Sequence, residues 1–165
     1  MRGLLRSQFQ QEKWKEAEGN AQELLKERSI GTDDRSLAGM AIARSLDDQG
    51  RYAEAQTAYR DVLAVNKAAL GAEARYRIAE TYFKSADWKN AERAAMETVN
   101  KAGSYDYWIT KAYILLGDIF VKEKDWFNAK ATLQSVVANS RITELKTEAQ
   151  AKLDEAIRLE KGSDK

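Results

Sequence analysis

The acidic side chains are the first candidates for chemistry in this chain, because it contains no histidine and no cysteine. Two carboxylates held close together can work as a general acid and a general base. The sequence places Asp33 beside Asp34 and Asp47 beside Asp48. Neighbouring residues on a helix point in different directions, so neither pair can hold one substrate between its two carboxylates. The residues therefore predict that the chain is not an enzyme.

Other motifs that support catalysis or bind cofactors are also absent from the sequence. Without histidine there is no Ser/His triad and no imidazole ligand for a metal, and without cysteine there is no thiolate or disulfide. No GxGxxG or GxxxxGK[ST] segment occurs that could surround a phosphate group. We predict no catalytic residue, no metal and no cofactor, and the cysteine content leaves the cellular compartment open.

The composition favours one folded unit built from helices. The 165 residues include 44% hydrophobic and 32% charged residues and no proline, with Ala, Leu, Glu, Lys and Arg abundant. The net charge is only +1, with both signs mixed along the chain, which argues against a nucleic-acid partner. No apolar run approaches the ~18 residues that a membrane-spanning helix needs, so we predict no membrane insertion.

A short phrase with one aromatic residue occurs four times: KWKEA at 13–17, RYAEA at 51–55, DWKNA at 87–91 and DWFNA at 125–129. The aromatic residues follow one another at intervals of 38, 36 and 38 residues. Before each of the last three phrases lies a helix-length segment without a breaker, such as AEARYRIAETYFK. A period of this length is typical of a solenoid made of repeated helix pairs.

Residues 72–105 resemble a tetratricopeptide repeat, with apolar, small and aromatic residues at that repeat's offsets: Ile78, Ala79, Tyr82, Trp88, Ala91 and Ala95. The resemblance implies an all-α fold, an α-solenoid of helix-turn-helix repeats wound as a right-handed superhelix with a C-terminal capping helix. Two features depart from the family pattern. The fourth position is Gly39, Arg75 or Tyr113 instead of tryptophan, and the proline that usually closes a repeat is missing.

The repeat register divides the chain into one array covering residues 1–165. We expect a truncated repeat at 1–31, repeats at 34–69, 72–105 and 106–140, a capping helix at 142–160 and a disordered tail at 161–165. In the capping helix, four apolar residues recur on one face, namely Leu145, Ala149, Leu153 and Ile157. Its other face is predicted to carry ion pairs between Glu148 and Lys152 and between Asp154 and Arg158.

Three local features follow from this register. The large ring that opens each second helix should pack over a small residue of the first helix: Ala43, Ala79 or Gly117. Asp87 and Asp125 should cap their second helices, whereas Lys13 and Arg51 cannot. Positive φ angles between repeats are expected at glycines, namely Gly31, Gly71 and Gly103.

The resemblance also implies that the first helices of successive repeats line a concave groove. The residues expected to face this groove are Arg6, Phe9, Met40, Arg44, Asp47, Tyr76, Glu80, Phe83, Lys84, Ile114 and Asp118. Arg6 and Arg44 would make one end cationic, and Glu80 and Asp118 would make the other end anionic. An alternative interpretation is that these residues form a solvated inner wall. The family's clamp for chaperone C-termini is not matched at the corresponding positions.

We therefore interpret the chain as a scaffold that binds a protein or peptide partner through this groove. Self-association into a homo-oligomer without a peptide ligand is an alternative. A third hypothesis, an RNA-binding helical repeat, is opposed by the acidic residues Glu73, Glu80 and Asp118.

Residues 107–140, YWITKAYILLGDIFVKEKDWFNAKATLQSVVANS, are in addition similar to the C-terminal repeats of large tetratricopeptide proteins from Bacteroidetes. Members of that group are long, often begin with an export signal and have no assigned chemistry. The resemblance implies that the chain is the C-terminal portion of a larger protein, located in the periplasm or associated with the cell envelope.

Overall fold

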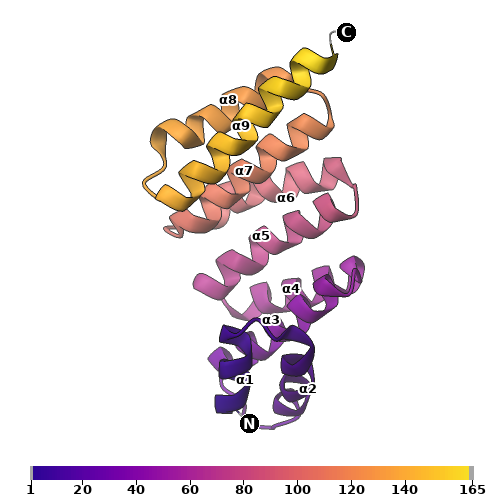
Figure 1. The fold of residues 1–165 in the computed structure, drawn as a ribbon. Helices are drawn as coiled ribbons and strands as arrows, with labels where there is room; N and C mark the ends of the chain where they lie inside the picture. Colours follow the sequence, from indigo (N-terminus) through magenta and orange to yellow (C-terminus); the bar gives the residue numbers. More distant parts are fainter. Residues whose placement is uncertain (1, 164–165) are drawn as a thin grey trace.

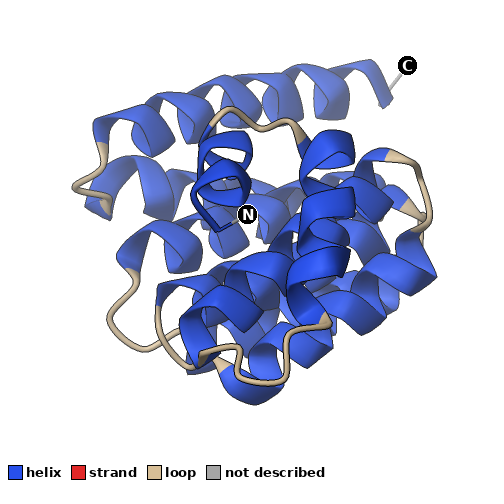
Figure 2. Cartoon of the chain, turned by 90° about the horizontal axis from the view of Figure 1, so that it is seen from below, coloured by secondary structure: helices blue, strands red, loops and turns tan. Residues whose placement is uncertain are grey.

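The computed structural model describes residues 2–163, and within this range it contains nine α-helices and no strand (Figures 1 and 2). The helices are α1 (Arg2–Gln10), α2 (Trp14–Leu25), α3 (Thr32–Asp48), α4 (Tyr52–Val65), α5 (Ala69–Lys84), α6 (Trp88–Lys101), α7 (Asp106–Lys122), α8 (Trp126–Asn139) and α9 (Thr143–Ser163). Within this range no helix is both long and apolar enough to cross a membrane.

The helices form two layers that are stacked along one direction (Figure 1). Each helix packs against the next one in the sequence, and each odd-numbered helix also contacts the next odd-numbered helix. Among the described residues, no two even-numbered helices contact each other. The odd-numbered helices therefore lie closer together and form the inner layer of a curved array. The predicted all-α solenoid is confirmed.

The turn within each helix pair has the same backbone conformation in all four pairs. Its key residue has a positive φ: 55° at Glu12, 73° at Gly50, 60° at Ala86 and 61° at Lys124. The next residue donates its backbone N–H to the carbonyl five positions earlier, as from Asp87 to Tyr82 at 3.0 Å. This Schellman arrangement satisfies carbonyls that the end of the first helix would otherwise leave without partners.

The prediction of positive φ at three glycines between the repeats is correct only for Gly103, where φ is 66°. Gly31 has an ordinary φ of −70°, and Gly71 lies inside α5. Gly71 is needed for space instead, because a Cβ atom there would lie 2.0 Å from the backbone oxygen of Asn66.

Two of the second helices have the expected aspartate cap. The side chains of Asp87 and Asp125 accept hydrogen bonds from the backbone N–H groups of Asn90 and Asn128. The residues at the corresponding positions in α2 and α4, Lys13 and Arg51, make no side-chain capping bond, as predicted. Each such cap contributes about 1 kcal/mol to helix stability.

Two of the aromatic residues that open the second helices also contact an aromatic residue near the end of the preceding helix, and Trp88 packs against the cluster that contains Ala79. Trp14 contacts Phe9 and Trp88 contacts Phe83, with ring centroids 5.1 and 5.2 Å apart. Trp88 is only half buried. The prediction that Gly117 makes room for a tryptophan is wrong, because a Cβ atom there would lie 2.6 Å from Cγ of Leu133. Gly117 instead allows α7 and α8 to approach closely.

Helix α9 covers the end of the array, where it packs against α7 and α8. Leu145, Ala149 and Leu153 are buried, as the periodicity predicted, and Ile157 packs at the edge of the same cluster. The ion pairs predicted within α9 are wrong, because Glu148 and Lys152 pair with residues of α7 instead. Asp154 accepts a hydrogen bond from Gln150, and Arg158 pairs with Glu155. The helix continues to Ser163, so 161–163 of the predicted disordered tail are helical; residues 164–165 lie outside the described range.

Candidate functional site

A cleft lies on the inner layer between α5, α7 and α9, and we call it the inner cleft. It consists of two adjoining cavities of about 230 and about 260 Å³. Both cavities are lined by Phe83, Asp118 and Lys152. The first is also lined by Tyr76, Glu80, Lys84, Lys111, Ile114, Leu115 and Glu148, and the second by Val121, Lys122, Glu155, Ala156 and Leu159.

The structure brings six of the eleven predicted groove residues to this cleft: Tyr76, Glu80, Phe83, Lys84, Ile114 and Asp118. The other five lie elsewhere, near the N-terminal helices: Arg6, Phe9, Met40, Arg44 and Asp47. Their distribution follows the order of the inner layer, in which α7 lies between α5 and α9 and contacts both, while α3 and α1 follow on the other side of α5.

Burial limits direct contact with a ligand for four of the predicted residues: Met40, Ile114, Tyr76 and Asp47 are at most 5% exposed. Met40 has no exposed surface and belongs to a core cluster with Tyr59 and Ile78. Ile114 is 2% exposed and packs with Leu133 and Leu145, so it supports the cleft from beneath. Among the predicted residues in the cleft, the accessible apolar residue is Phe83, which is half buried and lines both cavities. Leu159, which was not predicted, is 39% exposed and lines the second cavity.

The charged residues of the inner layer between α3 and α5 form one continuous chain of ion pairs. Asp47 lies 2.9 Å from Lys84, which lies 3.6 Å from Glu80. Glu80 pairs with Arg77 at 2.6 Å. Two more ion pairs follow: Arg77 lies 3.5 Å from Glu73, and Glu73 lies 2.9 Å from Arg44.

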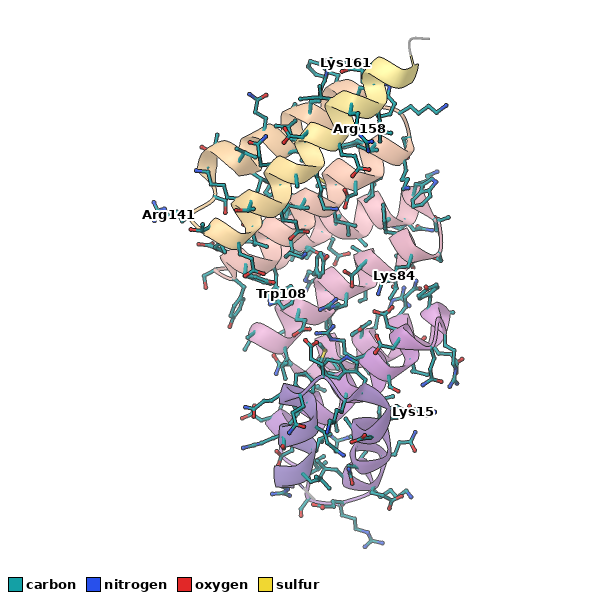
Figure 3. All side chains as sticks on the ribbon, viewed as in Figure 1. Lys15, Lys84, Trp108, Arg141, Arg158 and Lys161 are labelled. Atoms are coloured by element: carbon teal, nitrogen blue, oxygen red, sulfur yellow. The ribbon has the colours of Figure 1, made fainter. Side chains whose placement is uncertain are left out.

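These pairs change the predicted electrostatics of the groove. Arg44 is neutralised by Glu73, and at the N-terminal end Arg6 is neutralised by Asp34 at 3.1 Å. The expected division into a cationic and an anionic end is therefore wrong, because each charge has a partner of opposite sign close by. Figure 3 shows nitrogen and oxygen atoms interspersed along the ribbon.

Two further ion pairs connect α7 to α9 across the floor of the cleft. Lys111 lies 3.1 Å from Glu148, and Lys152 lies 2.6 Å from Asp118. The sequence analysis did not place Glu148 or Lys152 in the groove, because α9 was treated as a cap with its own internal pairs. Treating α9 as the first helix of a further repeat would have placed its polar face in the cleft.

Burial and charge act on the cleft carboxylates with different outcomes. Burial by itself would raise the pKa of Glu80, but Arg77 and Lys84 and hydrogen bonds from Arg77 and Tyr76 outweigh it and lower the pKa. For Asp118, burial raises the pKa above its ordinary value, and Lys152 offsets only part of that effect. Burial also raises the pKa of Tyr76, whose hydroxyl donates to Glu80 at 3.1 Å.

Aromatic residues hold the two inner helices together at the edge of the cleft. Trp108, from the first turn of α7, stacks at a tilt on Tyr76 of α5 with 5.5 Å between the ring centroids. Tyr107 contacts the edge of Trp108 at 4.9 Å, and Arg77 lies 5.8 Å from the centre of that ring. These contacts explain Trp108 as a packing residue and leave Phe83 as the aromatic residue open to a ligand.

The cleft combines paired charges with one half-buried aromatic ring. Within residues 2–163 there is no group of three histidine, cysteine, aspartate or glutamate side chains that could hold a metal ion. The three carboxylates of the first cavity each pair with a lysine or arginine. A half-buried aromatic ring surrounded by polar pairs has the composition of an interaction hot spot.

Two layers of helices, repeated turn geometry and a covering helix at one end define the class of this protein: an all-α repeat solenoid. Residues 111–140, most of α7 with α8, match the family model described as tetratricopeptide repeat. No curated protein matches the chain. Tetratricopeptide repeats generally mediate interactions between proteins, and such scaffolds typically have no catalysis of their own.

Proposed function

We propose that this chain is a protein-binding scaffold and that a peptide segment of its partner lies in the inner cleft. The observation that supports this most directly is the position of Phe83. Its ring is half buried, lines both cavities and is surrounded by charged residues from three helices. Aromatic residues in such settings are frequent anchors of protein interfaces.

The charges around Phe83 indicate which kind of peptide would bind. The side chains of Lys84, Lys152 and Glu148 are 36%, 31% and 32% exposed, so each can contact a ligand while keeping its partner within the protein. Both signs are present within one cleft, which suits a segment with an apolar residue between charged residues of opposite sign. The three carboxylates Glu80, Asp118 and Glu148 disfavour an RNA backbone, so RNA binding is not proposed.

A photo-crosslinking experiment tests this proposal. The crosslinking amino acid p-benzoylphenylalanine would replace Phe83 in one version of the protein and Phe127 in another. Phe127 is 79% exposed and lies on α8, outside the cleft. After irradiation in a cell extract, we expect one or a few proteins crosslinked through position 83 and not through position 127.

A second version of the experiment separates binding from folding. Phe83→Ala should reduce retention of the same partner by the protein on a column, with an unchanged circular dichroism spectrum, whereas Phe127→Ala should leave retention unchanged. Equal crosslinking through both positions, or equal retention by both variants, would contradict the proposed site.

Self-association remains a second candidate because two large apolar side chains are exposed at the two ends of the array. Leu4 is 54% exposed on α1, and Phe127 is 79% exposed on α8. Contact between such surfaces of two copies would bury them. A mass that increases with protein concentration in sedimentation and returns to the monomer value in Phe127→Ser supports this alternative; a constant monomer mass excludes it.

A further inference from the structure

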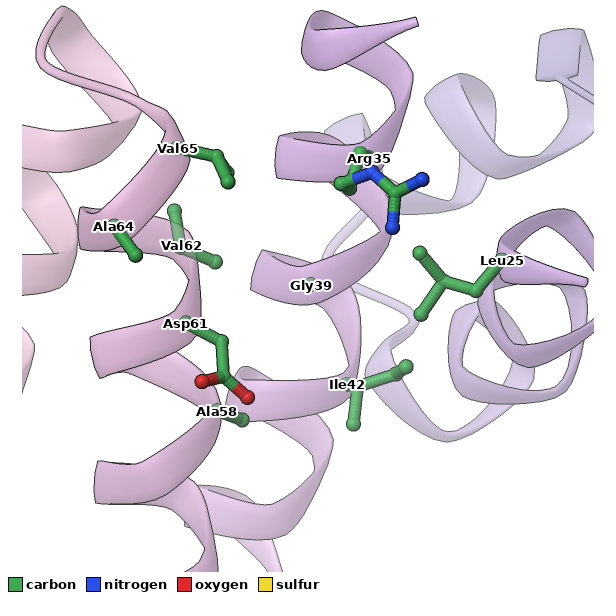
Figure 4. A pocket seen from close by; sticks show the side chains of 9 residues that line it. All are labelled: Leu25, Arg35, Gly39, Ile42, Ala58, Asp61, Val62, Ala64 and Val65. Carbon is green, nitrogen blue, oxygen red and sulfur yellow. The ribbon is translucent and has the colours of Figure 1, made fainter. Parts of the chain in front are cut away.

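A further cavity lies outside the inner cleft, between α2, α3 and α4 (Figure 4). Its volume is about 430 Å³, which is within the range of pockets that bind ligands. Apolar side chains of Leu25, Ile42 and Val62 line it, and Gly39 lies between them without a side chain (Figure 4). We call it the Gly39 pocket.

The next repeat has a long side chain at the position of Gly39. Gly39 precedes the turn residue Gly50 by eleven residues, just as Arg75 precedes Ala86. A Cβ atom at Gly39 would lie 2.8 Å from Cγ2 of Val62, so the glycine allows α3 and α4 to approach closely. The pocket lies beside this contact and is lined by both residues.

The second helix of each of these two repeats carries an acidic residue at the same position. Arg75 pairs with Glu97 of α6 at 2.8 Å. Asp61 follows Gly50 by eleven residues, as Glu97 follows Ala86, and so holds the position of Glu97 in α4. Within residues 2–163 the Asp61 side chain has no ion pair and no hydrogen bond. It lacks the cation that its counterpart has.

The pocket has a second charged residue without a partner. Arg35 lines it on the other side of Gly39 from Asp61 (Figure 4), and its side chain makes no ion pair or hydrogen bond in the described part of the chain. This differs from the inner cleft, where Glu80, Asp118 and Glu148 are all paired within the protein. Free charges of opposite sign beside an apolar pocket favour a ligand with the complementary pair.

We propose that the Gly39 pocket binds an arginine side chain of a partner protein, presented beside an acidic residue. The guanidinium group would pair with Asp61, as that of Arg75 pairs with Glu97, and its methylene groups would lie against Leu25 and Ile42. The neighbouring acidic residue would pair with Arg35. This site is separate from the inner cleft and does not depend on the function proposed for it.

Nuclear magnetic resonance titration of the ¹⁵N-labelled chain tests the proposal. The probe is the peptide acetyl-Gly-Glu-Arg-Glu-Gly-amide, and the comparison peptide has leucine in place of arginine. We expect the arginine peptide to shift the amide signals of Gly39 and Val62. Asp61→Asn, which keeps the shape of the side chain, should weaken its binding about tenfold, the loss expected for one charged hydrogen-bonded pair.

The matched control is Glu97→Gln, which makes the same change at the corresponding position of the next repeat and should leave the affinity of the peptide unchanged. Binding of the leucine peptide at equal affinity would overturn the proposal in favour of a purely apolar site. Equal affinity of Asp61→Asn, or no shift of the Gly39 signal at millimolar peptide, would also overturn it. Signals that shift with protein concentration in the absence of peptide would show that a second copy occupies the pocket instead.

Discussion

An alanine-to-glycine substitution should have opposite effects on the free energy of unfolding at a turn of a helix pair and inside a helix. Ala86 is exposed and has a φ of 60°, whereas Ala131 is exposed within α8. A residue with a Cβ atom in the left-handed region costs about 1–2 kcal/mol, and glycine in its place loses about 0.5–1 kcal/mol through the greater freedom of the unfolded chain. Ala86→Gly should therefore raise the free energy of unfolding by about 0.5–1 kcal/mol.

Ala131→Gly should lower the free energy of unfolding by about 1 kcal/mol, because glycine is a poor helix former. The reverse change Gly50→Ala, at a φ of 73°, should also be destabilising. Urea denaturation followed by circular dichroism measures all three. The reasoning fails if Ala86→Gly destabilises the protein as much as Ala131→Gly does.

The remaining predictions concern the packing and the charges of the inner layer. Gly117→Ala should lower the free energy of unfolding by about 1–2 kcal/mol in urea denaturation. The clash of the new methyl group with the neighbouring helix should cost more than alanine gains in helix propensity. An increase in the free energy of unfolding would refute this. Arg44→Glu should cost on the order of 3–5 kcal/mol since it disrupts a buried ion pair, whereas Arg6→Glu, at a pair whose arginine is 62% exposed, should cost less; equal losses would contradict the burial argument. The pKa of Glu80 is lower in the folded protein than its ordinary value of 4.5, so its charged form stabilises the fold at pH values above 4.5. This contribution is lost as the pH falls through the folded-state pKa. Glu80→Gln should therefore lose less stability than the wild type between neutral pH and about pH 3, and parallel profiles would refute this.

Much of the fold could be predicted because each repeat is determined mainly by residues that are close together in the sequence. A helix pair buries its apolar face mainly against the pairs on either side, so the periodic residues and the aspartate caps determine each unit almost independently. The positive φ angles within the helix pairs were not predicted, because the sequence shows glycine only at Gly50 among the four turn positions. Glu12, Ala86 and Lys124 adopt the same conformation because the packing of the helix pair imposes it.

The candidate site was predictable only in part, for a related reason. The register placed Phe83, Glu80 and Asp118 on the inner layer, where the structure has them. It could not show that Met40 is enclosed or that Lys152 pairs with Asp118, since both depend on where a different helix lies. Partners of opposite charge on separate helices leave no spacing pattern in the sequence.

The sequence by itself determined the helices, the repeat length and the absence of histidine and cysteine chemistry, because these depend on residue type and local spacing. The tertiary structure decided which charges neutralise each other, which apolar residues remain accessible and where space is left over. The Gly39 pocket illustrates the difference: the sequence shows a glycine where the next repeat has an arginine. Only the packing of three helices shows a cavity of about 430 Å³ beside this glycine and beside Asp61, whose carboxylate is unpaired within residues 2–163.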